Sequence, residues 1–365
     1  MKKLRIAQIA PLIESVPPKK YGGTERVVFY LTEGLVEKGH DVTLFASGDS
    51  TTSARLIAPV PTSIRLGRKT RSSLIMNMLM LEQVYEDMAG QFDIIHSHVE
   101  FHTLPFAARS PTPTVLTLHG RLDTPDYPRI LSRYRQMAYV SISDSQRLPV
   151  PDLNWAGTVY HGYPESLFSF NPDPEDYFLY LGRFSEEKRP DQAIMLARAC
   201  NIRLKIAAKI DPVDKAYFKQ RIEPLLDSPL IEYVGEVGDS RKSELLMNAR
   251  ALLNTIDWPE PFGLVMIEAL ACGTPVIVRR CGSSPEVVTH GVSGFVCDSK
   301  QDFIRAILNI DKISRAACRR EFENRFTLGH MTDNYENLYY KILAESSGCD
   351  AVSSEVAVKE GEIAA

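Results

Sequence analysis

One proline-rich segment of the sequence has the residues needed to bind an anionic ligand that carries hydroxyl groups. It reads Trp258-Pro-Glu-Pro-Phe-Gly-Leu-Val-Met-Ile-Glu-Ala-Leu270. Pro259 and Pro261 disfavour a helix before Phe262, so we predict that a helix begins around Gly263. The first N–H groups of a helix lack partners and carry a partial positive charge, which suits a diphosphate or a sugar oxygen.

Two glutamates lie on either side of this predicted helix start. Glu260 precedes it in the loop, and Glu268 lies about 7–8 Å beyond Gly263 at roughly 1.5 Å of rise per residue. A carboxylate accepts two hydrogen bonds, which matches the vicinal diol of a ribose. An isolated glutamate pair at this spacing is more often a pair of solvated charges, but the neighbouring prolines and Phe262-Gly263 favour binding.

Two cations follow another predicted strand. Arg183 comes at its end and Lys188 in the next loop, before Pro190 opens a helix. Such a pair can neutralise a leaving diphosphate, although read alone both are more often surface charges. The sequence contains no D-x-D triplet, a common handle for Mg²⁺ or Mn²⁺. We therefore predict chemistry with no metal site and no cofactor.

The loop before the first predicted helix provides further candidates. Gly22 and Gly23 allow the backbone to approach a phosphate or sugar closely, although a plain flexible loop is an equal interpretation. Glu14 and Tyr21 are candidate contacts for an acceptor, or simply solvated side chains. The loop has no G-x-G-x-x-G pattern, which argues against a nicotinamide dehydrogenase.

Histidines follow two strands of the first half. His119 ends one strand and is a candidate to point into a cleft, with a satisfied half-buried histidine as the alternative. The i, i+2, i+6 spacing of His96, His98 and His102 lacks the Cys or acidic partners of a tetrahedral metal site. We assign His98 to the acceptor side and treat the other two as structural.

The elements that must position these residues alternate between strand and helix. Short apolar runs bounded by turn residues predict strands, and amphipathic stretches between them predict helices, which together indicate parallel sheets built from βαβ units. The predicted strands are 4–10, 41–46, 92–97, 114–118, 138–142 and 158–160, then 177–182, 203–208, 231–235, 251–254 and 275–278. The predicted helices are 23–38, 72–89, 102–109, 190–200, 212–223, 239–248, 263–271, 301–308, 313–324 and 328–344.

A Pro- and Asp-rich stretch, Phe170-Asn-Pro-Asp-Pro-Glu-Asp176, interrupts the alternation and reads as a linker. We predict one domain over 1–165, a second domain over 166–326, and a helix at 327–345 that packs back on the first domain. Residues 346–365 are mostly small, polar or acidic and predict a tail without regular structure.

The segment 260–276 resembles the large retaining GT-B family called glycosyltransferase family 4. It shares that family's E-P-F-G-L-x-x-x-E-A-L-A-x-G-x-P-V block. Four further blocks follow the expected order: Gly22-Gly-Thr-Glu-Arg26, Val115-Leu-Thr-Leu-His-Gly120, Tyr180-Leu-Gly-Arg-Phe-Ser-Glu-Glu-Lys188, and Gly282-Ser-Ser-Pro-Glu286 with Gly291-Val-Ser-Gly294. The resemblance implies two Rossmann-like domains with parallel sheets that face each other across a cleft, an acceptor-side domain over 1–165 and a nucleotide-sugar-binding domain over 166–326.

The resemblance also implies roles for individual residues. His119 and Glu260 would contact the donor sugar, Glu268 the ribose, and the backbone of Phe262, Gly263 and Leu264 the sugar and phosphates. Arg183 and Lys188 correspond to the pair that replaces a divalent metal. Lys209, which departs from the family's G-x-G-P at this point, is a candidate for a phosphate or base contact, and Val237 lies where the family cradles the base with backbone groups.

Composition and charge set outer limits on the function. The net charge of −4 gives no reason to expect a nucleic-acid partner. No apolar run approaches the roughly 18 residues of a membrane helix, and the scattered cysteines indicate a cytoplasmic protein with reduced thiols. The basic segment 65–71 and the apolar run 72–81 are compatible with peripheral docking on an anionic inner-membrane face, but a solvated loop before a core helix is favoured.

The sequence thus predicts a hexosyltransferase that uses a nucleotide-diphosphate sugar, with UDP-glucose as the first choice because uridine is common in the family. The opening Ile6-Ala-Gln-Ile-Ala-Pro11, with 21–28, resembles a bacterial branch linked to polysaccharide and antibiotic glycosylation, so the expected acceptor is a saccharide or a lipid-linked saccharide. Two alternatives remain: a nucleotide-sugar 2-epimerase of the same fold, and a non-catalytic sugar-nucleotide-binding subunit.

Overall fold

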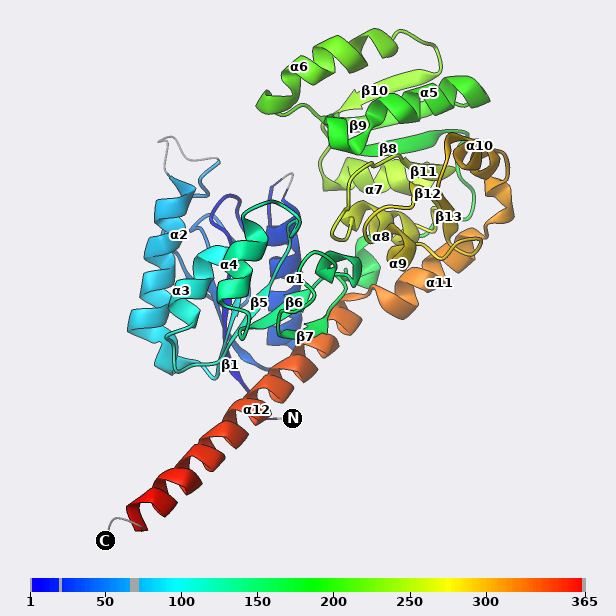
Figure 1. The fold of residues 1–365 in the computed structure, drawn as a ribbon. Coiled ribbons are helices and arrows are strands. Elements are labelled where there is room, and N and C mark those ends of the chain that lie inside the picture. The colour runs from blue at the N-terminus through cyan, green and yellow to red at the C-terminus, as the bar shows by residue number, and fades with distance from the viewer. Residues whose placement is uncertain (1, 20–21, 66–71, 363–365) are drawn as a thin grey trace. The chain divides into compact units, whose positions relative to one another are not determined.

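The computed structural model describes residues 2–19, 22–65 and 72–362. The chain forms two compact units, each described here by itself (Figure 1). Unit 1 comprises Met1–Ile142, Pro149–Val159 and Gly329–Ala365, and unit 2 comprises Ser143–Leu148 and Tyr160–Leu328.

Unit 1 contains a seven-stranded parallel sheet in the order β3-β2-β1-β4-β5-β6-β7. Its central strands are buried on both faces, which explains why they read as short continuous apolar runs in the sequence. The strands are β1 (Arg5–Ile9), β2 (Asp41–Phe45), β3 (Arg55–Ile57), β4 (Ile94–Ser97), β5 (Thr114–Thr117), β6 (Ala138–Ser141) and β7 (Trp155–Thr158).

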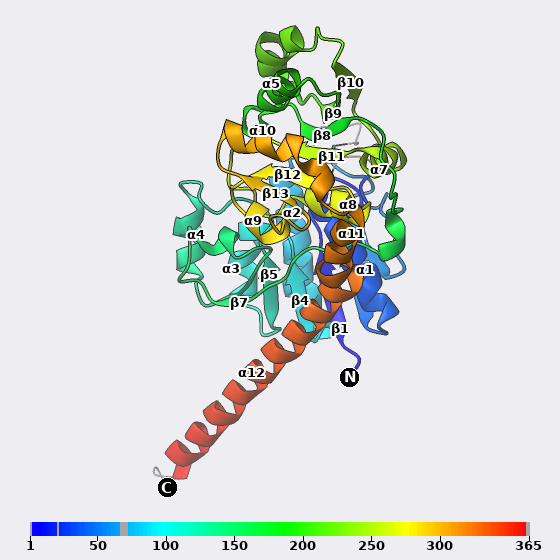
Figure 2. The same cartoon turned by 90° about the vertical axis from the view of Figure 1, so that its right-hand side faces the viewer.

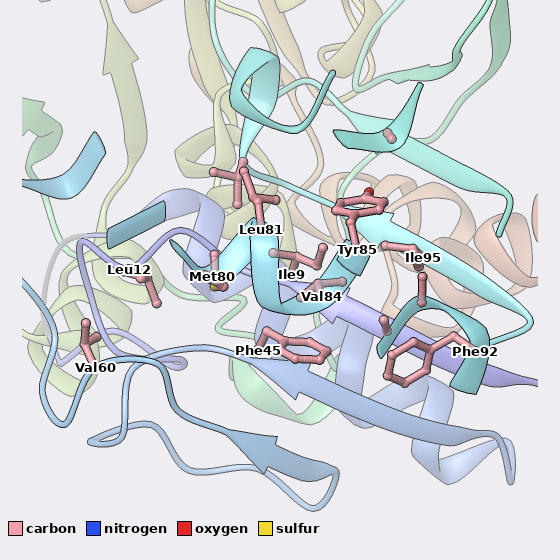
Figure 3. Packing of buried hydrophobic residues seen from close by; sticks show 14 residues of the cluster. Ile9, Leu12, Phe45, Val60, Met80, Leu81, Val84, Tyr85, Phe92 and Ile95 are labelled. Atoms are coloured by element: carbon pink, nitrogen blue, oxygen red, sulfur yellow. The ribbon is translucent and has the colours of Figure 1, made fainter. Parts of the chain in front are cut away.

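Helices cover both faces of this sheet (Figures 1 and 2). They are α1 (Gly23–Glu37), α2 (Ser73–Glu82), α3 (Leu104–Ala107), α4 (Tyr127–Arg133) and α12 (Leu328–Glu362). Residues of α2 and of the π-helical turn after it (Gln83–Met88) form one hydrophobic core with β1, β2 and β4, as Figure 3 shows for Met80, Leu81 and Tyr85. Val28 of α1 belongs to a second cluster, with Leu44 of β2.

Unit 2 contains a six-stranded parallel sheet in the order β10-β9-β8-β11-β12-β13. Its strands are β8 (Phe178–Arg183), β9 (Leu204–Lys209), β10 (Ile231–Gly235), β11 (Ala251–Asn254), β12 (Val276–Arg279) and β13 (Gly294–Cys297). Its helices are α5 (Pro190–Cys200), α6 (Lys215–Tyr217), α7 (Asp239–Asn248), α8 (Leu264–Ala271), α9 (Ser284–Val287), α10 (Lys300–Leu308) and α11 (Arg315–Arg325).

Most predicted elements are present, and the differences have local causes. The short elements β3, β13, α4 and α9 escaped prediction because three to seven residues carry little periodicity. The predicted helix 212–223 breaks into short pieces, of which only Lys215–Tyr217 is α-helical. Helix α12 continues to Glu362, through the segment from 346 for which the sequence predicts no regular structure, and no proline stops it there. Across the described ranges, no helix has both the length and the apolar character of a membrane span.

Candidate active site

In unit 2, the loops that carry the predicted residues leave the same edge of the sheet. Strands β9, β8 and β11 are parallel neighbours, so their carboxyl ends lie side by side. Lys188 follows β8, Asp211 follows β9 and Glu260 follows β11. In open α/β sheets this edge is where ligands bind, so the fold brings these loops to the expected place.

Lys188 and Glu260 form an ion pair between two of these loops. Trp258 supports both side chains: its indole Nε1 donates to Glu260 Oε2 at 3.0 Å, and the Lys188 ammonium lies 5.2 Å from its ring centroid. Both charged side chains remain partly exposed, at 22% for Lys188 and 16% for Glu260. The pair can therefore exchange partners with a ligand that offers phosphate and hydroxyl groups.

The loop that bears Glu260 is fixed by its backbone carbonyls. The Ser143 hydroxyl donates to the carbonyl of Pro261 at 2.6 Å, and Ser283 donates from its hydroxyl to Phe262 at 2.8 Å and from its N–H to Glu260 at 3.0 Å. Gly282 is pressed against the same loop, because a Cβ on it would lie 2.4 Å from the backbone N and O of Glu260. These contacts hold Glu260 in place from outside its own segment.

The predicted helix start is confirmed to within one residue. Gly263 is the N-cap of α8 with φ of 80°, and Leu264 is the first helical residue. A Cβ on Gly263 would lie 2.7 Å from Met266 and 3.3 Å from Glu260. The Phe262 side chain is buried among Tyr160, His161 and Phe326, so only its backbone is available to a ligand.

Glu268 lies one turn further along α8 and is buried, with 4% of its surface exposed. Its Oε1 accepts hydrogen bonds from the Tyr163 hydroxyl at 2.9 Å and from the Lys242 ammonium at 2.7 Å. Both donors bind the same carboxylate oxygen, so the side chain is fixed in direction. Glu268 is thus held ready as an acceptor for hydroxyl groups.

Arg183 is in register with Lys209 on the neighbouring strand. Its guanidinium lies among three carboxylates: Glu187 at 3.4 Å, Asp211 at 3.6 Å and Asp214 at 3.7 Å. Asp211 also binds the Lys209 ammonium at 2.5 Å. Burial raises the pKa of Asp214, and the neighbouring Asp211 and Glu187 charges add to this while Arg183 opposes it.

Val237 lies in the loop between β10 and α7 and is half-buried. Gly235, two residues earlier, has φ of 90°, with no atom within 4 Å of where a Cβ would stand. The loop after β10 therefore leaves room for a ligand beside its backbone.

In unit 1, His98 and His119 meet at the carboxyl ends of β4 and β5. His98 Nδ1 lies 2.9 Å from His119 Nε2, and His98 Nε2 lies 2.9 Å from Gln8 Oε1. Desolvation by burial lowers the pKa of His119 to about 3, so its ring is neutral at ordinary pH. The sequence pointed to both histidines but not to their direct contact.

A buried polar chain continues from Gln8 to the C-terminal helix. Gln8 Nε2 donates to the Tyr339 hydroxyl at 3.1 Å, which lies 2.6 Å from His96 Nδ1. His96 Nε2 lies 2.7 Å from Thr117 Oγ1, and Thr117 lies 3.0 Å from the Tyr335 hydroxyl. Burial, with a smaller contribution from His119, lowers the pKa of His96 well below its usual value. His96 is therefore a neutral structural histidine, as the sequence predicts.

Glu14, in the first loop of unit 1, interacts with charged residues from two other segments. Glu14 forms an ion pair with Arg65, and the Glu25 carboxylate is near enough to Glu14 to interact electrostatically. Burial raises the pKa of Glu25 to about 7, and the Glu14 charge adds to the shift. Gly22 is the N-cap of α1, where a Cβ would lie 2.7 Å from Pro18.

Three other residues singled out in the sequence remain to be placed. Gly23 is the first residue of α1, and Tyr21 lies outside the described residues. His102 Nδ1 lies 3.2 Å from the Val99 carbonyl, and its ring stacks on Phe101. Within the described residues, no three or more His, Cys, Asp or Glu side chains form a group that could hold a metal ion.

Sequence reasoning missed several supporting residues. The local sequence gives no reason to pair Gln8 with Tyr339, because 331 residues separate them. Glu100, with φ of 48°, accepts a hydrogen bond from the Gly120 N–H at 3.1 Å, next to His119. Only Gly282 had a visible signal, as part of the block 282–286.

Two family models match the chain. The model described as Glycosyltransferase Family 4 matches residues 21–148, and the model described as Glycosyl transferases group 1 matches residues 165–324. The chain is a glycosyltransferase of the GT-B, family 4 type. The two matched regions contain every candidate residue above except Glu14.

Solved structures support the fold of this glycosyltransferase. A glycosyltransferase involved in avilamycin A biosynthesis has a TM-score of 0.74 at 24% identity, covering 93% of this chain and 98% of that one. The Anabaena protein Alr3699/HepE in complex with UDP and glucose has a TM-score of 0.69 at 17% identity, covering 93% and 100%. At such identities the likeness concerns the fold.

A curated relative matches over a shorter region. The N-acetyl-alpha-D-glucosaminyl L-malate synthase of Bacillus anthracis is 34% identical over 94 residues, which is 24% of this chain and 25% of that enzyme. The match therefore spans about a quarter of the relative's length, and it does not fix the sugar or the acceptor.

Proposed function

We propose that this glycosyltransferase moves a hexosyl group from a UDP-sugar, with UDP-glucose as the first choice, to a saccharide or lipid-linked saccharide, with retention and without a metal ion. The observation that carries the proposal is the Lys188–Glu260 ion pair at the start of α8, on the edge of the sheet where Arg183 ends β8. At one edge of the sheet, a cation and a helix N-terminus can bind the diphosphate of a nucleotide sugar, and a carboxylate can bind its hydroxyl groups.

Charge neutralisation would come from the protein itself. Lys188 and Arg183 each contact carboxylates in this structure, and a diphosphate offers both cations a stronger partner. When Lys188 turns to the diphosphate, the Glu260 carboxylate is released to accept hydrogen bonds from sugar hydroxyls. The negative charge that develops on the leaving diphosphate is then met by fixed cations and by the N–H groups of α8.

Retention follows from attack on the same face that the diphosphate leaves. The acceptor oxygen bonds to the anomeric carbon as the bond to the diphosphate breaks, and the leaving diphosphate takes the acceptor's proton. This scheme needs no second catalytic carboxylate of the kind that retaining glycosidases use. His119, neutral in unit 1, would accept a hydrogen bond from a hydroxyl group of the sugar.

Three observations bear on the donor base and sugar. The neighbour from Anabaena binds UDP and glucose, and here the loop at Gly235 and Val237 leaves space beside its backbone. Glu268, held between Tyr163 and Lys242, would accept hydrogen bonds from the ribose hydroxyls. These points favour UDP-glucose over other donors as the first to test.

The proposed location is the cytoplasm, with peripheral contact at the inner membrane face. Helix α2 exposes Leu74, Ile75 and Leu79, each by more than half of its surface, and the basic segment before it lies largely outside the described residues. Flotation with anionic and neutral lipid vesicles tests the contact. Leu79→Ser should lower the fraction bound to anionic vesicles, whereas Val213→Ser, at an exposed site in unit 2, should not; no binding by the wild type would refute it.

The function is tested by transfer assays with UDP-, GDP- and ADP-sugars and saccharide acceptors. The wild-type protein should transfer glucose from UDP-glucose with retention and keep its rate in EDTA. Lys188→Ala or Glu260→Ala should lower the rate by about a hundredfold or more, as expected for loss of charge stabilisation at the reacting centre. Loss of activity in EDTA that Mg²⁺ restores would refute the metal-free mechanism, and formation of an isomeric UDP-sugar without acceptor would indicate an epimerase.

A further inference from the structure

Arg189, the residue after Lys188, has a backbone conformation that side-chain-bearing residues rarely adopt. Its φ and ψ are 50° and 49°, in the left-handed region, between the turn Glu186–Lys188 and the first residue of α5. This conformation disfavours any residue with a Cβ, and glycine adopts it without that penalty. An arginine at this position therefore needs contacts that offset the strain.

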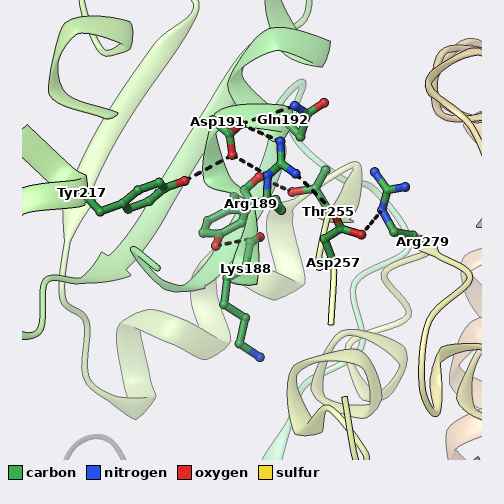
Figure 4. A network of polar contacts seen from close by, with 9 residues as sticks. Lys188, Arg189, Asp191, Gln192, Tyr217, Thr255, Asp257 and Arg279 are labelled. Carbon is green, nitrogen blue, oxygen red and sulfur yellow. Dashed lines mark hydrogen bonds and ion pairs between the residues drawn. The ribbon is translucent and has the colours of Figure 1, made fainter. Parts of the chain in front are cut away.

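The guanidinium of Arg189 makes three such contacts (Figure 4). Its Nε and Nη2 donate to the two carboxylate oxygens of Asp191, each at 3.0 Å, and its Nη1 donates to Asp257 at 3.1 Å. Asp191 is itself buried and accepts a further hydrogen bond from Tyr217 at 3.2 Å. The bidentate geometry fixes the direction of the side chain as well as its position.

The backbone around Arg189 is tied to the same loop. The Thr255 hydroxyl donates to the Arg189 carbonyl at 2.7 Å, and the N–H of Asp257 donates to the Glu187 carbonyl at 2.9 Å. Lys188 thus lies between two residues whose carbonyls are bonded to the loop 255–257. Its own carbonyl accepts a hydrogen bond from Tyr180 at 3.3 Å.

The loop 255–257 leads directly to Glu260. Asp257 is adjacent to Trp258, the residue whose indole supports both the Lys188 ammonium and the Glu260 carboxylate. The contacts of Arg189 therefore join the loop that bears Lys188 to the loop that bears Glu260. The guanidinium of Arg189 acts here through Asp191 and Asp257.

We propose that Arg189 is a positioning residue that fixes the separation of Lys188 and Glu260 by joining their two loops through Asp191 and Asp257. This inference rests on the proposed roles of Lys188 and Glu260 in transfer. The role explains why an arginine is present at a position whose left-handed backbone glycine would adopt without strain. A residue serving stability alone would leave the reaction rate unchanged once the fold is intact.

Arg189→Gly separates the two roles, because glycine removes the guanidinium and also relieves the backbone strain. We expect the variant to stay folded while kcat falls by about 10- to 100-fold, the scale on which small misplacements of catalytic groups act, with KM for the donor changed by less than about threefold. Asp257→Asn, which keeps a weaker partner for Arg189, should give an intermediate loss.

Asn201→Gly is the matched control. Asn201 follows α5 in the same left-handed conformation, with φ of 51°, so glycine also fits the backbone there, at the opposite end of α5 from Lys188. This variant should keep wild-type kcat and KM. A folded Arg189→Gly protein with wild-type kcat would overturn the proposal.

Hydrogen exchange provides a readout that does not depend on activity. The Asp257 N–H should exchange faster in Arg189→Gly than in Asn201→Gly, because its hydrogen bond to Glu187 is no longer supported by the guanidinium contact to Asp257. Unchanged exchange at Asp257 in a folded Arg189→Gly protein would overturn the positioning role. If the wild type transferred no sugar but Asp257 exchange still rose, the proposed function would fail while the joining of the loops stood.

Discussion

His98 Nδ1 lies 2.9 Å from Nε2 of His119, while the other ring nitrogen of His98 lies 2.9 Å from the side-chain oxygen of Gln8. An amide oxygen only accepts hydrogen bonds, so His98 donates to Gln8 from Nε2. With its proton on Nε2, His98 accepts from His119 through Nδ1, which places the His119 proton on Nε2. The Nδ1 atom of His119 is therefore an acceptor, as a contact with a sugar hydroxyl requires.

Replacing Tyr339 with phenylalanine should disturb His119 from a distance. The Tyr339 hydroxyl holds Gln8 and His96 together, and its loss leaves a buried donor and acceptor without that partner. We expect the variant to lose about 1–3 kcal/mol of stability, and the ring ¹⁵N signals of His119 to change. Long-range ¹H–¹⁵N spectra of protein labelled at histidine, together with unfolding curves, measure both effects.

Tyr340→Phe is the control for this prediction. Tyr340 is on the same helix, but its hydroxyl donates to the backbone carbonyl of Lys2 and has no place in the buried chain. The His119 signals should match the wild type in this variant. Equal spectra for the two tyrosine variants would show that Tyr339 does not influence His119.

Glu25 should make the protein less stable as the pH rises. Its pKa is about 7 in the folded protein, because of burial first and the Glu14 charge next, against an ordinary value of 4.5. Between these pH values the unfolded chain releases the proton while the folded protein keeps it. The stability that is fully present below pH 4.5 is therefore lost by about pH 7, at a cost of about 3 kcal/mol.

Glu25→Gln should remove this loss, so that the variant is more stable than the wild type at pH 8 and not at pH 4. The buried His96 and His119 act in the opposite direction, since lowered pKa values make stability rise with pH through the acid range. The comparison is therefore between urea unfolding curves of the two proteins at each pH. Glu37→Gln, at an exposed position on the same helix, should follow the wild type.

Much of the fold was accessible from the sequence because the central strands are buried on both faces. Apolar runs such as 251–254 and amphipathic stretches such as 190–200 coincide with β11 and α5. The start of α8 was predictable because Pro261 excludes helix before it and Gly263 permits the left-handed cap. Local sequence was sufficient wherever a local constraint decided the structure.

The supporting contacts of the site were not accessible in this way. Arg189 reads as an ordinary surface cation, since its left-handed backbone and its bond to Asp257 depend on tertiary structure. The contact between Gln8 and Tyr339 joins the two ends of the chain. Sequence patterns indicate the period and spacing of residues within one segment. The roles of Arg189, Gln8 and Tyr339 depend on contacts with distant segments, which form only in the folded protein.

Glu286 should hold the segment Ser143–Leu148 in unit 2. Its carboxylate accepts hydrogen bonds from the N–H groups of Asp144 and Ser145, at 2.8 and 2.7 Å, and from the Tyr160 hydroxyl at 3.2 Å. Burial and the Glu286 charge raise the pKa of Tyr160 to about 12, so the hydroxyl stays a donor. Glu286→Ala should speed hydrogen exchange at Asp144 and Ser145.

Glu286→Gln tests whether an acceptor or the charge is needed. Glutamine keeps one acceptor oxygen, so exchange at these amides should be intermediate between the wild type and Glu286→Ala. Ser143 lies at the start of the segment and donates to Pro261, so the Glu286→Ala variant should also lose transfer activity. Wild-type exchange rates in Glu286→Ala would mean that the segment is held by other contacts.

Gly282→Ala should inactivate the enzyme through the Glu260 loop. Gly282 has φ of 56°, and a Cβ there would lie 2.4 Å from backbone atoms of Glu260, a distance that forces the loop to move. Gly291 has φ of 80° with no atom within 4 Å of the Cβ position, so Gly291→Ala introduces backbone strain alone, about 1–2 kcal/mol. We expect both variants to be destabilised but only Gly282→Ala to lose kcat, by about tenfold or more, as expected when a catalytic group is displaced. Transfer assays on folded protein at matched concentration decide the point: equal activity of the two variants would mean that the position of Glu260 does not limit the reaction.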